Sequence, residues 1–318
     1  MDLIYTDANR KDQGILTAYA FDLSFGAAEN DFEMTLGANE PALSDGSFAY
    51  IEGTEYGGIV DGIKASTNSN SVTYKGRTWH GLMNSKIIEP DTGEPYLIVS
   101  GDANEVLAML IDRLGLTGLF VAVGELSGIN IPKYQFRRYC KGYDGIRDML
   151  GDNGAKLKIE WVNRAVQLSA APVADYTDTP ADSDTASLNV EKYSKKVNHL
   201  ICLGQGNLTD REVIHLYVDQ FGNIGDEQYY FGLEEIAETY ENTNSEDLRQ
   251  DGISRLKSLR NNDKAEISLN KANAIPYDIG DIVGASEIRT GITVAAIVTQ
   301  KIIKIKNGVI STEYKTGE

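Results

Sequence analysis

The chain has 318 residues, of which 42% are hydrophobic and 24% charged, and its formal net charge at pH 7 is −17. This length allows about two domains, each large enough to bury a core without disulfides or metals. The acidic excess disfavours broad electrostatic binding to nucleic acid or to anionic lipid. We expect neither a signal peptide nor a membrane span, because no basic start precedes an apolar segment and no window holds about eighteen apolar residues.

Cysteine and glycine usage narrows the class of protein further. The two cysteines, Cys140 and Cys202, lie in unrelated segments, and the apolar neighbours of Cys202 predict a small buried residue. No disulfide framework is present, which favours synthesis in a reducing compartment. The 31 glycines, 17 tyrosines and only 7 prolines are typical of a β-rich protein with many turns.

Residues 1–99 are predicted to form short strands joined by turns, as in a barrel or a sandwich. The clearest signal lies in residues 19–36, where two runs of alternating apolar and polar residues flank a turn at 26–30. The apolar positions are Phe21, Leu23, Phe25, Phe32, Met34 and Leu36. They predict a β-hairpin with one buried face and with Glu29, Asn30 and Asp31 at its exposed turn. The expected strands are 15–25, 31–36, 48–51, 58–66, 71–74 and 79–88.

Residues 100–172 change to a mixed pattern that predicts a small α+β module. Apolar residues recur at helical spacing over 102–114, where Asp102 is placed to cap the helix and Gly115 to end it. A second helix is expected over about 143–150, followed by a hairpin of strands 157–161 and 165–169 around an Asn163-Arg164 turn. Residues 173–190 combine acids, prolines and small polar residues without an apolar period, and they predict an acidic linker.

Residues 191–318 return to strand patterns and are predicted to form a second β domain. Strands are expected at 197–203, 211–219, 265–269, 282–285, 292–306 and 309–314, with turns at 219–223 and at Asn307-Gly308. A helical acidic insertion of about 225–262 interrupts them. It contains nine acids against the single base Arg249 between residues 225 and 251, and a helix capped by Ser245 that runs to about Leu259. The predicted fold class is therefore α+β and mainly β.

Only three histidines are present, which limits metal and general-base chemistry. His80 lies in the predicted strand 79–88, whereas His199 and His215 alternate with apolar residues on neighbouring strands and are placed to meet across a ladder. A metal site there needs a further ligand, and the nearby candidates are Asp210, Glu212 and Cys202. We prefer the alternative of ordinary cross-strand residues with satisfied ring nitrogens. The sequence therefore predicts no catalytic residue, no cofactor and no metal, and leaves a metal between His199 and His215 as an open alternative.

Motifs of known enzyme chemistry are absent from the sequence. It contains no Gly-x-Ser-x-Gly, no phosphate-binding loop, no His-Glu-x-x-His and no Cys-x-x-Cys. Residues 204–208 hold a Gly-x-Gly after a strand, but a second strand follows where a helix is required, so a turn is predicted. Spacing alone does not exclude a carboxylate pair for glycoside hydrolysis, because two such residues need only converge in space.

Two charged segments need an interpretation. The acidic segment 226–251 lacks the alternating Asp-x-Asp-x-Asp-Gly loop of a calcium site, and we interpret it as a solvated face or a wall facing a polyanion. Lys133, Arg137, Arg138 and Lys141 are interleaved with aromatic residues, a pattern found in nucleic-acid binding. In so acidic a chain, a protein contact or an ordinary amphipathic surface is the preferred interpretation.

Three co-linear segments carry a resemblance to a known family. They are residues 21–33 in the N-terminal hairpin, residues 76–82, and residues 197–204 continuing to 210–217. With these segments the chain resembles the tail hub proteins of tailed bacteriophages and of phage-derived contractile, bacteriocin-like particles. More specifically, it is similar to the siphovirus tail family of Gram-positive hosts, which is related to the late control protein D hubs.

The resemblance implies a structural protein and not an enzyme. It implies two β-barrel tube domains with intervening α+β modules, and a homotrimeric ring whose pseudo-sixfold surface connects the hexameric tail tube to the trimeric spike or tip. The implied partners are a tail tube or tube-initiator protein, a spike or tip protein, baseplate proteins and a tape measure protein, with DNA only as passing cargo and no membrane insertion. The implied location is the tail or baseplate of a phage-like particle made in the host bacterial cytoplasm.

Alternatives remain open at this point. The chain is also interpretable as a tail-associated protein that binds cell-wall glycans or hydrolyses peptidoglycan, or as a soluble monomeric enzyme with an unrecognised site. The sequence does not decide between a contractile and a non-contractile tail, nor whether the particle carries DNA.

Overall fold

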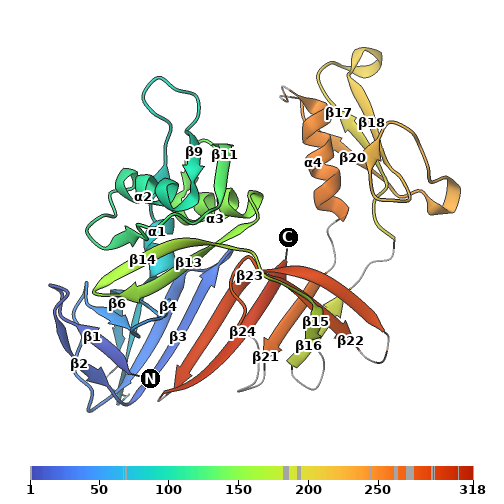
Figure 1. Ribbon diagram of the computed structural model, residues 1–318. Coiled ribbons are helices and arrows are strands. Elements are labelled where there is room, and N and C mark those ends of the chain that lie inside the picture. Colours follow the sequence, from blue (N-terminus) through green and yellow to red (C-terminus); the bar gives the residue numbers. More distant parts are fainter. Residues whose placement is uncertain are drawn as a thin grey trace. The chain divides into compact units, whose positions relative to one another are not determined.

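The computed structural model describes residues 2–66, 68, 70–181, 186–191, 195–243, 245, 247–260, 264–269, 276–287, 289, 291–306 and 308–317. They fall into two compact units (Figure 1). Unit 1 comprises Met1–Leu188 together with Glu266–Gly317, and unit 2 comprises Asn189–Ala265. The chain therefore leaves unit 1 once, builds unit 2 and returns to complete unit 1.

Strands make up most of the regular structure. Before unit 2 the elements are β1 (Leu3–Thr6), β2 (Asp12–Leu16), β3 (Tyr19–Gly26), β4 (Asp31–Gly37), β5 (Phe48–Tyr50), β6 (Gly57–Ala65), β7 (Ser71–Thr78), α1 (Trp79–Asn84), β8 (Ile87–Ile88), β9 (Ile98–Asp102), α2 (Ala103–Arg113), β10 (Phe120–Ala122), β11 (Asn130–Gln135), β12 (Cys140–Lys141), α3 (Gly142–Asp152), β13 (Ala155–Val162), β14 (Ala165–Pro172), β15 (Asp175–Ala181) and β16 (Ala186–Glu191). Unit 2 contains β17 (His199–Leu203), the 3-10 turn η1 (Leu208–Asp210), β18 (Val213–Val218), β19 (Ile224–Gly225), η2 (Gly232–Glu234), β20 (Ala237–Glu241) and α4 (Leu248–Arg260). The chain then adds β21 (Lys264–Leu269), β22 (Ile282–Glu287), β23 (Ile292–Lys306) and β24 (Val309–Gly317).

One large sheet joins the N-terminal and C-terminal strands of the chain. Its main order is β16-β21-β24-β23-β3-β4-β7-β6-β5-β1-β2, and β15 and β22 join it through the pairing of β22 with β23. The predicted hairpin is confirmed, because β3 and β4 pair antiparallel with Leu23 opposite Phe32, and the apolar face of both strands is buried. On its other side β3 pairs with β23, where Leu23 lies opposite Ile303. Figure 1 shows these blue N-terminal strands beside the red C-terminal ones.

This topology divides the chain differently from the predicted domains 1–99, 100–172, 173–190 and 191–318. Strands β22–β24, expected in a separate C-terminal domain, lie in the same unit as β3–β7, because the backbone ladder between β23 and β3 holds them in one sheet. Residues 189–265 alone form the second unit, which surrounds the predicted insertion 225–262. Over the described residues the main strand order ends at β2 and β16, so the strands form one open sheet in place of two closed barrels. The fold is α+β and mainly β, as the sequence predicts.

Two strands occupy the predicted linker 173–190. β15 pairs in parallel with β22, with Asp175 opposite Ile282, and β16 lies next to β21. The linker prediction fails at residues 175–181 because ladder hydrogen bonds join backbone groups and do not require an apolar period in the side chains. The Tyr176 ring meets the Tyr277 ring edge-on at 5.1 Å between centroids, which adds a side-chain contact to the ladder.

The predicted strand 79–88 is instead the helix α1 followed by the short strand β8. Thr78 begins the helix, since its side chain accepts a hydrogen bond from the Gly81 backbone N–H at 3.3 Å. Trp79 and Met83 lie one turn apart and are both fully buried. A separation of four residues fits one face of a helix and also one face of a strand, so this short segment did not reveal the helix in the sequence.

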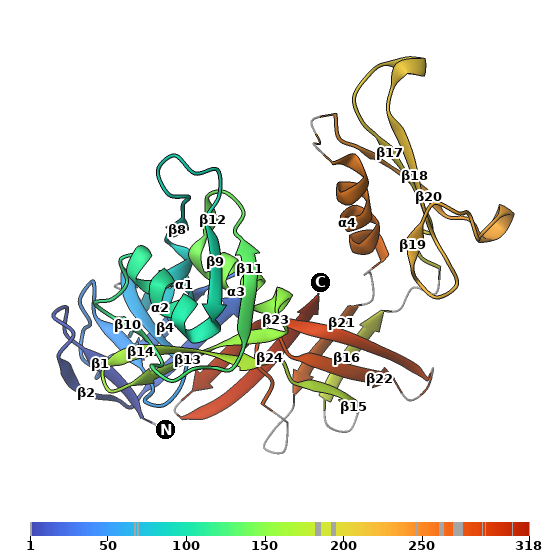
Figure 2. The same ribbon diagram turned by 45° about the horizontal axis from the view of Figure 1, so that its top comes forward.

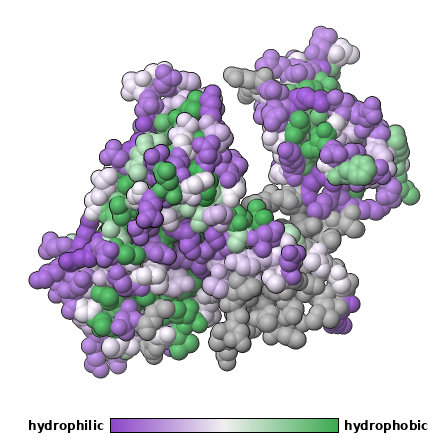
Figure 3. Space-filling view, in the orientation of Figure 1, coloured by the Kyte–Doolittle hydropathy of each residue, from purple (hydrophilic) through white to green (hydrophobic). Residues whose placement is uncertain are grey.

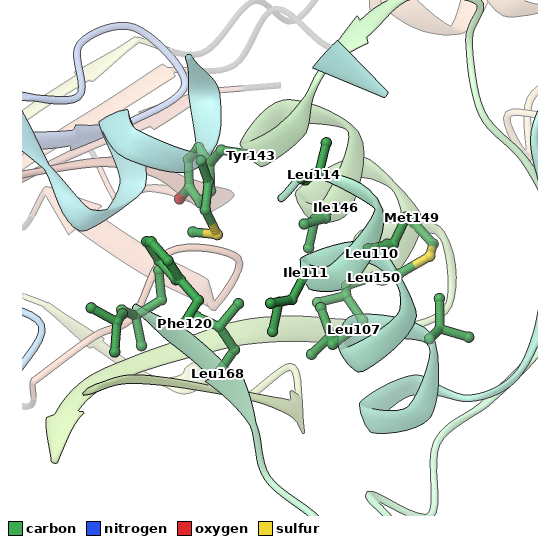
Figure 4. Close-up of a cluster of buried hydrophobic side chains, with 14 of the residues drawn as sticks. Leu107, Leu110, Ile111, Leu114, Phe120, Tyr143, Ile146, Met149, Leu150 and Leu168 are labelled. Atoms are coloured by element: carbon green, nitrogen blue, oxygen red, sulfur yellow. The ribbon is translucent and has the colours of Figure 1, made fainter. Parts of the chain in front are cut away.

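The predicted α+β module is confirmed in both helices and in its hairpin. α2 and α3 pack against β13 and β14, which turn at Asn163 and Arg164, both with positive φ. Figure 4 shows the apolar side chains of this module in one cluster, among them Leu107, Leu110, Ile111, Leu114, Phe120, Ile146, Met149, Leu150 and Leu168. Burial of each such side chain contributes about 1.5–3 kcal/mol to the free energy of unfolding. Cys140 and Cys202 are both free, so no disulfide adds to this stability. The module is thus held by its apolar core.

Asp102 caps α2 as predicted and also holds a distant loop. Its carboxylate accepts hydrogen bonds from the backbone N–H of Asn104 at 2.9 Å, of Ser127 at 3.0 Å and of Gly128 at 2.9 Å. Burial alone would raise the pKa of Asp102, but these hydrogen bonds outweigh it and lower the pKa. The cap therefore fixes the loop before β11 as well as the helix.

Unit 2 packs α4 against a four-stranded sheet with the order β19-β18-β17-β20 (Figure 2). The buried core consists of Leu200, Cys202, Leu216, Val218, Leu248 and Leu256. Cys202 is fully buried, as predicted, and a Cβ atom added at Gly252 of α4 would lie only 2.4 Å from its Sγ atom. The helix approaches the sheet this closely because position 252 has no side chain.

The start of α4 differs from the prediction. Asp247, and not Ser245, caps it, because the Asp247 carboxylate accepts a hydrogen bond from the Gln250 backbone N–H at 3.0 Å. The Ser245 hydroxyl instead donates to Asp251 at 2.5 Å. The predicted turn at 219–223 is confirmed, with Asp219 accepting hydrogen bonds from the backbone N–H of Phe221 and Asn223. Among the helices of the described residues, none has the length and apolar composition needed to cross a membrane.

Candidate assembly surfaces

A groove of about 480 Å³ lies on the outer face of the N-terminal strands, opposite the buried side of the hairpin. Its walls come from β3, β4, β6 and β7, with Ile302 of β23 at one side. The charged residues that line it are Asp22, Glu29, Asp31, Glu33, Asp61, Lys75 and Arg77. With five acids against two bases, this face of the sheet is acidic.

Part of that charge is neutralised across neighbouring strands. Lys75 pairs with Glu33 at 2.8 Å, and Arg77 holds Asp61 through two guanidinium nitrogens at 2.7 and 2.8 Å. Asp31 is different: its side chain is exposed, but neighbouring protein atoms desolvate it enough to raise its pKa, and the nearby Glu29 charge adds to the effect. Glu29 and Asp31 thus place two neighbouring carboxyl groups at the hairpin end of the groove.

The turn of the hairpin is fixed by β23. Asn30 accepts a hydrogen bond from the Gly26 N–H at 2.9 Å and donates to the Gly26 carbonyl at 3.0 Å. The Gln300 side chain donates to the Glu29 carbonyl at 2.9 Å. The Glu29 and Asp31 side chains remain exposed, whereas Asn30 is half-buried, so the prediction of an exposed turn holds for the two acids only.

A buried ionic cluster joins β13 to the segment before β22 within unit 1. Lys156 donates to Asp281 at 2.6 Å and to Asp278 at 3.0 Å, and Lys158 donates to Asp278 at 2.9 Å. Asp281 is fully buried and also accepts a hydrogen bond from the Ala174 backbone N–H at 3.0 Å. Three segments far apart in sequence are held together at this point.

Lys301 of β23 adds a further ion pair to the cluster, with Glu55 at 2.6 Å. Burial alone would lower the pKa of Lys301, but the Glu55 charge outweighs it and raises the pKa above its ordinary value. Burial alone would raise the pKa of Asp278, but the hydrogen bonds from Lys158 and Lys156 lower it. Lys301 and Asp278 are therefore both charged at neutral pH.

A cavity of about 210 Å³ borders this cluster, and several acid–base groups line it. His80 lines it, stacks on Phe25 at 4.3 Å between ring centroids and lies 3.6 Å from Glu55. Burial, together with the Lys301 charge, lowers the pKa of His80 to about 3, so the ring is neutral at pH 7. Glu55 and Asp278 are both ion-pair partners of lysines. The lowered pKa of Asp278 keeps it ionised, whereas general acid catalysis needs a protonated carboxyl group.

In unit 2 the two histidines meet across the ladder, as predicted. His199 Nε2 lies 2.8 Å from His215 Nδ1, and His199 Nδ1 lies 2.6 Å from a Glu235 carboxylate oxygen. The Tyr217 ring stacks on the His199 ring at 4.3 Å between centroids. The carboxylate beside the pair is thus Glu235, and Cys202 lies in the core beneath α4. The part of the chain that the structure describes holds no group of three or more His, Cys, Asp or Glu side chains that could bind a metal ion.

The acidic segment is tied to nearby bases at several points. Asp226 pairs with Arg249 at 2.6 Å, Glu234 with Lys195 at 3.1 Å, and Glu241 with Arg211. Figure 3 shows many hydrophilic residues among the coloured atoms of unit 2. These observations fit the interpretation of the segment as a solvated face.

The basic and aromatic stretch 133–143 has the character of an amphipathic surface. Phe136 and Tyr143 are buried in the core of the module, and Arg137 pairs with Asp148 at 2.6 Å. Arg138 lies over the exposed Tyr139 ring at 5.3 Å. The aromatic residues of this stretch are therefore divided between core and surface.

The sequence and the fold can be compared with those of known proteins. No family model matches the sequence, and no curated protein matches it. Among solved structures, the 43 kDa tail protein of prophage MuSo2 from Shewanella oneidensis has a TM-score of 0.59 at 10% identity, over 99% of this chain and 98% of that one. Prophage tail protein gp18 from Listeria monocytogenes EGD-e has a TM-score of 0.57 at 14% identity, over 100% and 94%. A chain of the phage p2 virion baseplate in its activated conformation has a TM-score of 0.51 at 12% identity, over 99% and 98%.

The fold is that of phage tail and baseplate proteins. The expected resemblance is confirmed at this level, and it extends over both units of the chain.

Sequence reasoning missed two features that this tail-protein fold contains. Lys301 lies on the buried face of β23 together with Ile303 and Ile305, so a lysine at the same strand face as these two isoleucines was the available signal. Glu235 carried no such signal, because it was one of nine acids in its segment.

Proposed function

We propose that this chain is a structural protein of a phage-like tail, the hub that connects the tail tube to the spike or tip. The likeness in fold over the whole chain supports this most strongly, since 99–100% of the chain is covered together with 94–98% of three tail and baseplate proteins. A likeness limited to one small domain would suit many functions. Here the likeness in fold includes the large sheet, the α+β module and unit 2.

In this proposal three copies form a ring with a pseudo-sixfold surface, and each copy supplies two barrel-like tube surfaces. The large open sheet supports the idea, because its terminal strands have backbone groups that a neighbouring copy is able to complete. The partners of the ring are the tail tube or tube-initiator protein, the spike or tip protein, other baseplate proteins and the tape measure protein. Its location is the tail or baseplate of the particle.

The acidic groove on β3, β4, β6 and β7 is a candidate wall of the central channel. Negative charge on such a wall repels passing DNA and keeps it from adhering. In a particle without DNA this reason does not apply, and matching to a basic partner explains the charge instead.

Electron microscopy of the particle tests the proposal directly. We expect the chain at a central threefold position beneath the tail tube, and any other position contradicts the hub assignment. Incubation of the purified protein with cell walls tests the alternative, because release of muropeptides would show a peptidoglycan hydrolase and not a purely structural protein. The matched control in that assay is the protein after heat denaturation.

A further inference from the structure

We propose that unit 2 binds a divalent transition metal of the Cu²⁺ or Ni²⁺ type between His199 and His215. The two nitrogens that face each other, His199 Nε2 and His215 Nδ1, come from the adjacent strands β17 and β18 and lie 2.8 Å apart. The Tyr217 hydroxyl lies 3.4 Å from the same nitrogen of His215. Two nitrogen donors and one oxygen donor thus gather on the sheet face away from α4.

A carboxylate supports the His199 ring in the manner of a metal ligand. His199 Nδ1–H donates to Glu235 at 2.6 Å, which fixes the proton on Nδ1 and leaves Nε2 with its lone pair toward His215. Histidines that bind metals almost always donate their other ring N–H to a carboxylate, a carbonyl or a water in this way. The ring is also immobilised, because His199 is only 7% exposed and stacks on Tyr217.

The donor set suits one class of metal ion. The separation of 2.8 Å between the two nitrogens is that of a hydrogen bond, so a small turn of the His215 ring is enough to bring both nitrogens to one ion. Sites with nitrogen and oxygen ligands in square-planar or tetragonal geometry are typical of Cu²⁺ and Ni²⁺. Two imidazole nitrogens with a tyrosine hydroxyl or water beside them therefore favour these ions.

Without metal, a hydrogen bond from His215 Nδ1–H to His199 Nε2 holds the two rings together. Metal binding requires the His215 proton to move from Nδ1 to Nε2, with no change in the charge of the ring, and the ring to turn until its Nδ1 lone pair meets the ion. His215 is exposed, so water carries the proton and the ring has room to turn. Tyr217 or water fills the next coordination position. Glu235 stays outside the ligand set, which is why three side chains of the usual metal-binding types do not converge here.

The experiment uses the full-length protein without an affinity tag, titrated with CuSO₄ and separately with ZnCl₂ by calorimetry, and measured with Cu²⁺ by electron paramagnetic resonance. We expect one Cu²⁺ per chain with the spectral signature of two nitrogen ligands, and weaker binding of Zn²⁺. His80 is the one other histidine of the sequence and is fully buried, so the two-nitrogen signature reports on this pair.

Two variants and a control decide the outcome. His215→Gln changes an exposed residue and should abolish the two-nitrogen signature, and Glu235→Gln should weaken Cu²⁺ binding about 10–100-fold. Glu238→Gln removes another acid at the surface of the same sheet and should bind as the parent does. Equal binding by His215→Gln and the parent, a spectrum with one nitrogen, or no saturable binding overturns the proposal. If His215→Gln does not fold, unchanged affinity in Glu235→Gln overturns it instead.

Discussion

Replacement of Asp281 by alanine is expected to destabilise unit 1 by about 3–5 kcal/mol. Asp281 is fully buried and accepts hydrogen bonds from Lys156 Nζ at 2.6 Å, from the Ala174 N–H at 3.0 Å and from the Asp278 N–H at 2.8 Å. Alanine removes the acceptor of all three hydrogen bonds at once. The buried Lys156 ammonium is then left with Asp278 as its partner in the cluster.

The magnitude follows from what is lost and what survives. A hydrogen bond to a charged group contributes roughly 1.5–3 kcal/mol, and Asp281 makes three. The surviving contact between Lys156 and Asp278 at 3.0 Å offsets part of this loss, which keeps the expected value in the range for one broken buried ion pair. Glu33→Ala is the matched control, because its partner Lys75 is exposed and such surface pairs contribute only about 0–1 kcal/mol.

Urea unfolding followed by tryptophan fluorescence measures this effect. Trp79 and Trp161 are the two tryptophans of the sequence, and both are buried in unit 1 with their rings stacked at 5.0 Å between centroids. Their emission therefore reports on unit 1 and not on unit 2. If the free energy of unfolding falls by less than 1 kcal/mol in Asp281→Ala, or by no more than in Glu33→Ala, the ionic cluster does not hold unit 1 together.

Three further predictions use the same protein. Asp102→Ala should lower the free energy of unfolding by about 0.5–2 kcal/mol, because the helix cap is lost. It should also speed amide exchange at residues 127–128, measured by mass spectrometry, because the loop contacts are lost. Unchanged exchange at these residues argues against the loop contact. The pKa of Asp278 is lowered in the fold, so its contribution to stability is complete above the unfolded pKa of about 4 and is lost as the pH falls toward the folded value; the urea midpoint should decline below pH 4 less steeply in Asp278→Asn than in the parent. Gly26→Ala should cost more than about 1 kcal/mol, because φ is +139° and the new Cβ atom would lie 2.2 Å from the Thr299 carbonyl oxygen, whereas Gly93→Ala, at φ +90° in open space, should cost less when both are measured by urea unfolding.

The sequence predicted those elements in which one face of a strand or helix is buried along its whole length. The hairpin β3–β4 and the helix α2 have this character, and their apolar periods lie at the predicted residues. α1 was missed because its six residues are too few to separate a period of 3.6 from a period of 2. Strands β15 and β16 were missed because their pairing rests on backbone groups that no side-chain pattern reveals.

Local sequence patterns do not reveal which strands pair with each other in the sheet. Leu23 lies opposite Ile303 on β23, and no residue near either position indicates this pairing. The predicted domains differ from the two compact units for the same reason, since they follow changes in composition and the units follow the strand pairing. The meeting of His199 and His215 was predictable because both lie on one hairpin, whereas the third member, Glu235, arrives from a segment that adds a parallel strand.

The pairing of β3 with β23 has a consequence for synthesis of the protein. Gln300 donates a hydrogen bond to Ser24, a residue that leaves the ribosome 276 residues earlier. At about 5–20 residues per second, the N-terminal hairpin waits roughly 14–55 s before β23 is available to cover its open edge. Unit 2 is contiguous in sequence and needs no such delay. Chains that stop before residue 292 would keep the edge of β3 open, and these truncated products are the ones we expect to aggregate.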